Sequence, residues 1–197
     1  MNREELLKNA KPIIFSTSMV KAILDGKKTQ TRRVVNPQPD RFFEVCDTPG
    51  NYHLYDVEWG LGRIYPKYQV GDILWVRETF CEVPYEHNHV PIKGGYITIP
   101  KYAYKADSER DYTGIWKPSI HMPREAARIF LRVKEVSVER LIDISDSDVV
   151  NEGFQTKNDF FALWDKLNYH RGFGVANNPF VWKIEFERVI RQNGGQD

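Results

Sequence analysis

Cysteine is scarce in this sequence. Only Cys46 and Cys81 occur among its 197 residues, and neither belongs to a Cys-x-x-Cys pair. Their spacing argues against a structural zinc site, which usually takes its ligands from such pairs. We expect two free thiols, as in a reducing compartment, rather than a disulfide.

Long apolar runs and an excess of charge are also missing. No run approaches the roughly 18 apolar residues of a membrane span, and the charged start of the chain lacks the apolar core of a signal peptide. The 28 Lys and Arg residues nearly balance the 27 Asp and Glu residues, which gives a formal net charge of +1. No overall field therefore attracts nucleic acid or a membrane, so any anion site has to be local. We expect a cytoplasmic protein with no membrane partner.

Aromatic residues, in contrast, are plentiful, with five Trp, ten Tyr and eleven Phe. Strand-like patterns dominate, the predicted helices are short, and no βαβ alternation recurs, which indicates an α+β mixed barrel with helices at its ends. We expect one domain over residues 12–190, with a polar lead-in at residues 1–11 and a disordered tail at residues 191–197. The pattern weakens at about residues 40–67 and 82–101, which we interpret as two insertions.

One segment combines an apolar helix pattern with a dense polar run. Ser18 is a plausible N-cap, and Gly26 is a plausible helix stop because glycine tolerates the left-handed conformation. Hydroxyl, amide and cationic side chains fill residues 27–33, a composition that an ordinary strand does not need. The apolar positions of the predicted helix follow helical spacing: Met19, Val20, Ile23 and Leu24.

Three motifs give the chain a family resemblance. They are GKKTQTR at residues 26–32, VGDILWVRE at residues 70–78 and WKIEF at residues 182–186. Together they resemble the ASCH domain family, and more narrowly its longer bacterial and prophage members. The resemblance implies a PUA-like fold, a small mixed β-barrel with short flanking helices, and an association with RNA or nucleosides.

The resemblance also implies a catalytic set. Some small ASCH proteins are amidohydrolases that remove the acetyl group from N4-acetylcytidine without a metal or other cofactor. They use a Lys and a Thr three residues apart, matched here by Lys28 and Thr31, and a late Glu, matched by Glu152. A threonine hydroxyl needs a base to become a nucleophile, and a lysine serves as that base only if its pKa falls toward neutrality.

A structural interpretation of the same residues stays open. Lys28 would then be a solvated cation at a helix C-terminus, and Thr31 an ordinary strand residue. In a straight strand the two side chains point to opposite faces. They converge only if Lys28 still belongs to the helical turn.

A binding module without turnover is the alternative function, and a ribonuclease is a third. In the binding module the partner is RNA or a modified nucleotide, and phosphate contacts come from Lys27, Lys28, Arg32, Arg33 and Arg77. Alternation places Arg32 and Arg33 on opposite strand faces, which argues against one shared ligand.

The strand at residues 73–80 supplies further candidates. Arg77 and Glu78 lie near its end, where they either contact a base or sugar or form a structural ion pair. Trp75 either stacks on a base or packs in the core.

A metal site has little support in the sequence. The candidate ligands are His87, His89, His121 and Cys81. His87 and His89 lie close together in a predicted loop, but no third ligand follows at a defined spacing.

Overall fold

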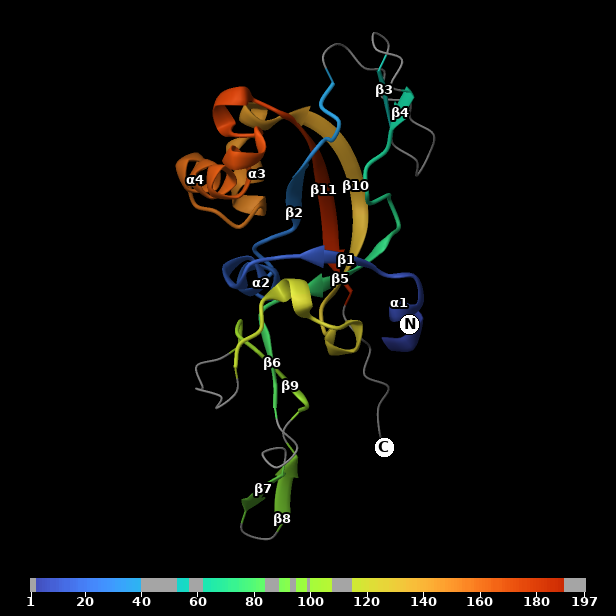
Figure 1. Cartoon of the computed structure of the whole chain (residues 1–197), viewed down its shortest axis with the longest axis vertical. Coiled ribbons are helices and arrows are strands. Elements are labelled where there is room, and N and C mark those ends of the chain that lie inside the picture. Colours follow the sequence, from blue (N-terminus) through green and yellow to red (C-terminus); the bar gives the residue numbers. More distant parts are fainter. Residues whose placement is uncertain are drawn as a thin grey trace.

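The centre of the molecule is a five-stranded mixed sheet (Figure 1). A computed structural model describes residues 3–39, 53–56, 62–83, 89–92, 95–98, 100–107 and 115–189. The sheet has the order β1-β5-β10-β11-β2, with β1 parallel to β5 and the other pairs antiparallel. Its strands are β1 (Lys11–Ile14), β5 (Ile73–Arg77), β10 (Phe130–Arg140), β11 (Phe180–Arg188) and β2 (Gln30–Val34). The α+β class is therefore confirmed, and β1 and β2 are the two edges of the described sheet.

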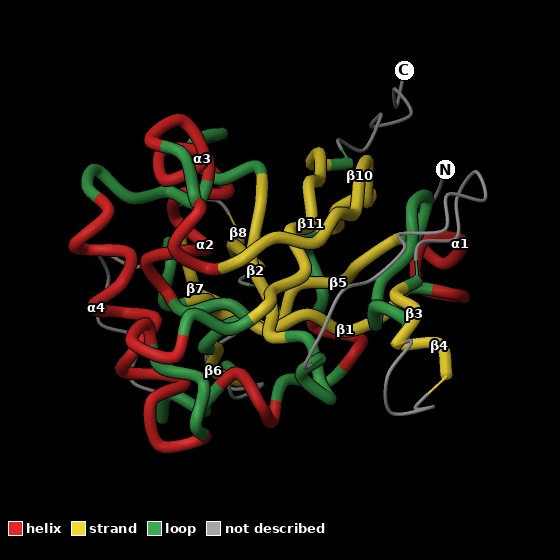
Figure 2. Tube along the Cα trace, turned by 90° about the horizontal axis from the view of Figure 1, so that it is seen from above, coloured by secondary structure: helices red, strands yellow, loops and turns green. Residues whose placement is uncertain are grey.

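Four short α-helices flank the sheet: α1 (Arg3–Asn9), α2 (Thr17–Leu24), α3 (Asp146–Asn151) and α4 (Lys157–Asn168). Figures 1 and 2 show α2, α3 and α4 gathered on the side of β2, with α1 on the opposite side. Single 3-10 turns add η2 (Ser119–His121), η3 (Arg124–Ala126), η4 (Leu141–Asp143), η5 (Tyr169–Arg171) and η6 (Val175–Asn177). Among the described helices, none has the length and apolar content that crossing a membrane requires.

In the described part of the chain, three two-stranded sheets lie outside the main sheet. They are β3 (Leu54–Asp56) with β4 (Gly62–Ile64), β6 (Phe80–Glu82) with β9 (Tyr102–Tyr104), and β7 (His89–Ile92) with β8 (Gly95–Thr98). Figure 1 shows β7 and β8 well away from the sheet. These two-stranded sheets fall in or beside the two expected insertions. The expected tail at residues 191–197 lies outside the described residues.

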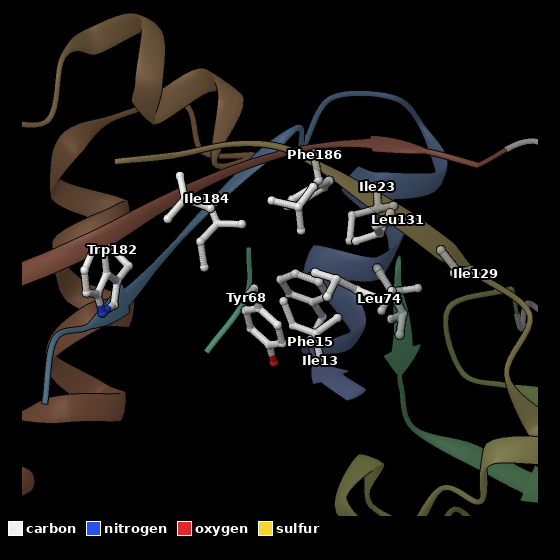
Figure 3. Close-up of a cluster of buried hydrophobic side chains, with 14 of the residues drawn as sticks. Ile13, Phe15, Ile23, Tyr68, Leu74, Ile129, Leu131, Trp182, Ile184 and Phe186 are labelled. Atoms are coloured by element: carbon white, nitrogen blue, oxygen red, sulfur yellow. The ribbon is translucent and has the colours of Figure 1, made fainter. Parts of the chain in front are cut away.

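The main hydrophobic core lies on one face of the sheet (Figure 3). Strand β11 sends Trp182, Ile184 and Phe186 into it from every second position, as expected for one face of a strand. Phe15 packs against Phe186, with ring centroids 6.1 Å apart. A second core joins the other face of the sheet to α3 and α4: Leu141, Ile144, Val149, Phe160, Trp164 and Val181.

The start of helix α2 differs from the sequence prediction. Ser16, not Ser18, is the N-cap of α2, and its hydroxyl accepts from the Met19 amide at 3.4 Å. Helix α4 begins at Lys157, directly after its N-cap Thr156, whose hydroxyl accepts from the Asp159 amide at 3.2 Å. In both helices the cap lies three residues before the amide that it satisfies.

The N-terminal segment is more than a polar lead-in. It forms α1, whose Leu6 is only 1% exposed. Leu6 and Ala10 cluster with Trp75, Ala127 and Phe130. This packing anchors α1 on the sheet.

The two edge strands come close to each other, and we call the line between them the seam. Arg33 on β2 donates from Nη2 to the carbonyl of Ile14 on β1 at 3.1 Å. Nearby, the Tyr68 hydroxyl donates to the β1 carbonyl of Pro12 at 2.7 Å. The sheet is therefore curled strongly enough for one side chain to span its edges.

Candidate active site

The end of helix α2 positions Lys28. Gly26 has φ +73°, and its N–H donates to the carbonyl of Ile23 at 3.1 Å. The amides of Lys27 and Lys28 both donate to the carbonyl of Ala22, at 2.8 and 3.0 Å. These bonds make a Schellman motif, in which a left-handed residue closes the helix. Lys28 therefore belongs to the helix-ending turn, before β2 begins, and strand alternation does not separate it from Thr31.

Helix α3 ends in the same way and positions Glu152. Gly153 has φ +88°, and its N–H donates to the carbonyl of Val150 at 2.9 Å. The next amide, that of Phe154, reaches the carbonyl of Val149 at 3.0 Å. Glu152 is the last residue before the left-handed glycine, so the turn fixes where its side chain starts.

The two helix ends touch. A Cβ built on Gly153 would lie 3.1 Å from the Ala22 Cβ and 3.4 Å from the Lys28 Cβ. The Thr29 amide also donates to the carbonyl of Asn151 at 2.9 Å, which ties the entry of β2 to α3. A glycine at position 153 is thus needed both for its backbone conformation and for the close approach.

This contact forms a buried ion pair. Lys28 and Glu152 are each 2% exposed, and the lysine Nζ donates to Oε2 of Glu152 at 2.5 Å and to its carbonyl at 2.9 Å. Burial lowers the pKa of Lys28 below its usual value, although Glu152 opposes the shift; the charges of Arg33 and Arg32 lower it further. A lysine with a lowered pKa is better suited to accept a proton than a solvated one.

Arg32 is a structural clamp rather than a free phosphate contact. Its Nε donates to Glu139 Oε1 at 2.6 Å, its Nη1 to Glu152 Oε1 at 3.2 Å, and its Nη2 to Asp148 Oδ2 at 3.0 Å. Three carboxylates thus surround a guanidinium whose side chain is fully buried. The sequence indicated the cation but not these partners, which come from strand β10 and helix α3.

Asp148 gathers several partners of its own. Gln30 donates to its Oδ1 at 2.8 Å, and the Lys183 Nζ lies 3.1 Å from the same oxygen. Burial alone would raise the pKa of Asp148, but these two bonds and the charge of Arg32 outweigh it and lower the pKa to about 2. Asp148 therefore joins β2, α3 and β11 electrostatically.

Arg33 holds the hydroxyl of Thr31. Its Nη1 donates to Thr31 Oγ1 at 2.8 Å, and Thr31 is buried. Arg33 and Lys28 both lie over the ring of Phe15, at 5.3 and 5.6 Å from its centroid. Among the described residues Arg33 has no salt bridge, and burial lowers its pKa. No hydrogen bond joins Lys28 to Thr31 in this part of the chain.

A pocket of about 370 Å³ opens beside this group, and we call it the Thr31 pocket. Thr31, Arg32, Arg33 and Glu152 supply its polar wall, while Lys28 lies behind Glu152 and does not line it. Arg32 and Arg33 both line the pocket, although strand alternation was expected to separate them. The opposite wall is apolar and comes mainly from α4: Phe154, Phe160, Leu163, Trp164 and Leu167.

The remaining predicted contacts lie elsewhere. Trp75 is buried with α1. Glu78 receives two bonds from Arg128, at 2.8 and 2.9 Å. Lys27 is exposed and pairs with Asp25 at 3.3 Å. None of Trp75, Glu78 and Lys27 is among the described residues that line the Thr31 pocket.

Arg77 lies by the seam rather than in the Thr31 pocket. Its Nη2 donates to the carbonyl of Ile120, and its guanidinium lies 5.6 Å from the ring centroid of Trp75.

The described residues contain no group of three side chains that could hold a metal ion. Cys81 is buried and free, and burial raises the pKa of its thiol. Cys46 and His87 lie outside the described residues.

Comparison with known proteins gave no relative, because no family model, no curated protein and no solved structure matches the chain. The chemistry of the site is therefore argued from its geometry.

Proposed function

We propose that the chain is an ASCH-type amidohydrolase that cleaves the acyl group from a modified pyrimidine nucleoside such as N4-acetylcytidine. One observation carries the proposal. The buried Lys28–Glu152 pair lies beside a pocket that Glu152 and Thr31 both line. A buried lysine next to a carboxylate and a threonine is the set that base-activated nucleophilic catalysis needs.

The proposed reaction has two stages. Neutral Lys28 takes the proton of the Thr31 hydroxyl, and the oxygen attacks the acyl carbonyl. The C–N bond then breaks, the amine leaves with the proton from Lys28, and water hydrolyses the acyl-threonine to release a carboxylic acid. Lys28 and Thr31 are not hydrogen-bonded in the free protein, so the first transfer needs one bridging water or a small shift on substrate binding.

Arg33 and the aromatic wall have supporting roles. Because Arg33 donates to Thr31 Oγ1, it stabilises negative charge that develops on that oxygen. Phe154, Phe160 and Trp164 offer apolar surface for a pyrimidine ring. Glu152 orients the amine of Lys28 through its 2.5 Å contact.

The fold supports a PUA-like barrel as part of this proposal. The curled five-stranded sheet, the near approach of β1 and β2, and the helices flanking β2 are the features that such a barrel would have.

The test is turnover of N4-acetylcytidine, followed by chromatography of released cytidine. Thr31→Val and Lys28→Met should each lower kcat by at least about 100-fold, the usual scale for losing a nucleophile or its base. Thr29→Val and Lys21→Met are the matched controls, because both positions are exposed and lie outside the pocket lining. Folding of each variant is checked by circular dichroism.

A nucleotide- or RNA-binding module is the second candidate. It is favoured by the bond from Arg33, rather than Lys28, to the Thr31 hydroxyl. If the folded parent protein releases no cytidine in a validated assay, the binding function replaces the enzymatic one. Binding of cytidine compounds would then be measured by calorimetry at low and high salt.

A further inference from the structure

A second pocket, of about 390 Å³, lies at the seam between β1 and β2, and we call it the seam pocket. Its walls include Ile14 of β1, Arg33 and Val34 of β2, and residues 65–68. Arg33 and Val34 also line the Thr31 pocket. The two pockets are therefore neighbours that share one arginine.

The seam pocket is cationic. Arg33, Lys67 and Arg77 line it, and none of the described residues in its lining is acidic. The described part of the chain provides no salt bridge to any of the three. Elsewhere the buried cations are matched: Lys28 has Glu152, and Arg32 has three carboxylates. In a protein with a net charge of +1, this local excess is a notable departure from charge balance.

Arg77 also has an unused donor. Its Nε is buried and has no hydrogen-bond partner among the described residues. A buried donor without a partner costs free energy, so a ligand oxygen that accepted from this Nε would remove that cost. The lining adds Asn36 and the half-exposed Tyr65, which supply further polar groups and an aromatic ring.

We propose that the seam pocket binds a phosphate monoester group, held by Arg77, Lys67 and the donors of Arg33 that its bonds to Thr31, Arg32 and Ile14 leave over. Arginine offers planar paired donors that match phosphate oxygens, and lysine adds a point charge. If the proposed function holds, on which this statement about the substrate rests, the acylated base occupies the Thr31 pocket and the phosphate occupies the seam pocket. The substrate is then a nucleotide rather than a free nucleoside.

Calorimetry at low salt tests the site without any need for turnover. We expect cytidine 5′-monophosphate to bind at least about tenfold more tightly than cytidine, and inorganic phosphate to compete with the nucleotide. Arg77→Gln and Lys67→Gln should each remove most of this preference. Lys67 is exposed, so Lys67→Gln keeps the test valid if Arg77→Gln fails to fold.

Arg132→Gln is the matched control. Arg132 lies on the same sheet, is 44% exposed and pairs with Glu187, and it lines neither pocket. The control variant should bind the nucleotide like the parent protein. Equal affinity for cytidine and its monophosphate, no measurable nucleotide binding, or a preference that survives both seam substitutions would each overturn the proposal.

A kinetic comparison separates this proposal from the proposed function. The parent should hydrolyse N4-acetylcytidine 5′-monophosphate with a kcat/KM at least about tenfold above that for N4-acetylcytidine, and Arg77→Gln should bring the ratio toward one. Turnover of both compounds at equal kcat/KM overturns the phosphate site and leaves the amidohydrolase intact. Tight nucleotide binding without turnover of either compound overturns the amidohydrolase and leaves the phosphate site intact.

Discussion

The side chain of Lys28 combines two properties that rarely meet in a lysine. It is buried, and its amine contacts a carboxylate. Burial favours the neutral amine, whereas Glu152 favours the charged form; burial is the larger effect, so the pKa of Lys28 lies below its usual 10.5. Under the proposed function, the same residue therefore matters both for reactivity and for stability.

A pH–rate profile measures the reactive role. A general base works only when it is unprotonated, so kcat for acylcytidine hydrolysis should rise with pH as Lys28 loses its proton. The midpoint should lie below 10.5, the ordinary value for lysine. A flat profile, or a rise with the same midpoint in whatever activity Lys28→Met retains, would exclude Lys28 as the base.

A double-mutant cycle measures the structural role. Removing one partner of a buried ion pair usually costs about 3–5 kcal/mol, because the other charge is left buried. We expect about 3 kcal/mol for Lys28→Met, since Arg32 still contacts Glu152, and a similar loss for Glu152→Gln. The double variant should lose at least about 1 kcal/mol less than the sum. Urea unfolding gives all three values, with Lys21→Met as the exposed control; additive losses would show that the pair is not coupled.

At the scale of elements, the site depends on two helix ends that meet back to back. Each helix ends at a glycine with positive φ, and Gly153 lies against Ala22 and Lys28 of the other helix end. The backbone hydrogen bonds of these two helix-ending turns therefore fix the positions from which Lys28 and Glu152 form their ion pair.

Gly153→Ala tests this contact against a matched position. Gly71 has the same φ of +88° but has no atom within 4 Å of an added Cβ. Gly71→Ala should therefore cost only the strain of a left-handed alanine, about 1–2 kcal/mol. Gly153→Ala should cost at least about 1 kcal/mol more, because its Cβ would press on the Ala22 Cβ at 3.1 Å. Urea unfolding of both variants provides the comparison, and equal losses would contradict a tight approach at Gly153.

The helix ends were also the part of the site that could be predicted from sequence. A glycine after an apolar helix pattern indicates where Lys28 leaves its helix, and the family resemblance linked Lys28 to Thr31 and Glu152. The partners of Arg32 could not be predicted, because Glu139 and Asp148 reach it only through strand register and the packing of α3 on β2. The same applies to the bond from Arg33 to Thr31.

Apolar patterns in the sequence indicate core positions but not every role of the side chains that occupy them. The alternation of β11 and the helical stripe of α4 were readable as core positions. That Phe160 and Trp164 also line a pocket was not readable, because the free edge of β2 is a property of the assembled sheet. Sequence alone likewise gave no sign that Leu6 would bury itself against Trp75.

At the scale of the whole molecule, Asp148 makes the stability of the fold depend on pH. Its pKa is about 2 in the folded protein and 3.8 for an ordinary aspartate, so its ionised form stabilises the fold. That contribution is fully present above about pH 4 and is lost as the pH falls through the folded value of about 2.

Asp148→Asn should therefore destabilise the protein by about 2 kcal/mol at pH 7 and by much less near pH 2. Urea unfolding of the parent and variant at both pH values gives the difference. Asp146→Asn is the control, because that carboxylate lies on the same helix and is 94% exposed; its effect should stay within about 0.5 kcal/mol. If the free energies of unfolding of the parent and Asp148→Asn differed by the same amount at both pH values, the lowered pKa of Asp148 would be contradicted.

The strand order has a consequence for folding during synthesis on the ribosome. In the described sheet, β2 has a single neighbour, β11, which is the last strand to be synthesised. The early strand that carries Thr31 and Arg33 thus waits, unpaired, until residues 180–188 have emerged. Glu152 arrives only shortly before. Any catalytic function of the site therefore requires that β11 has been synthesised, because β11 is the strand that pairs with β2.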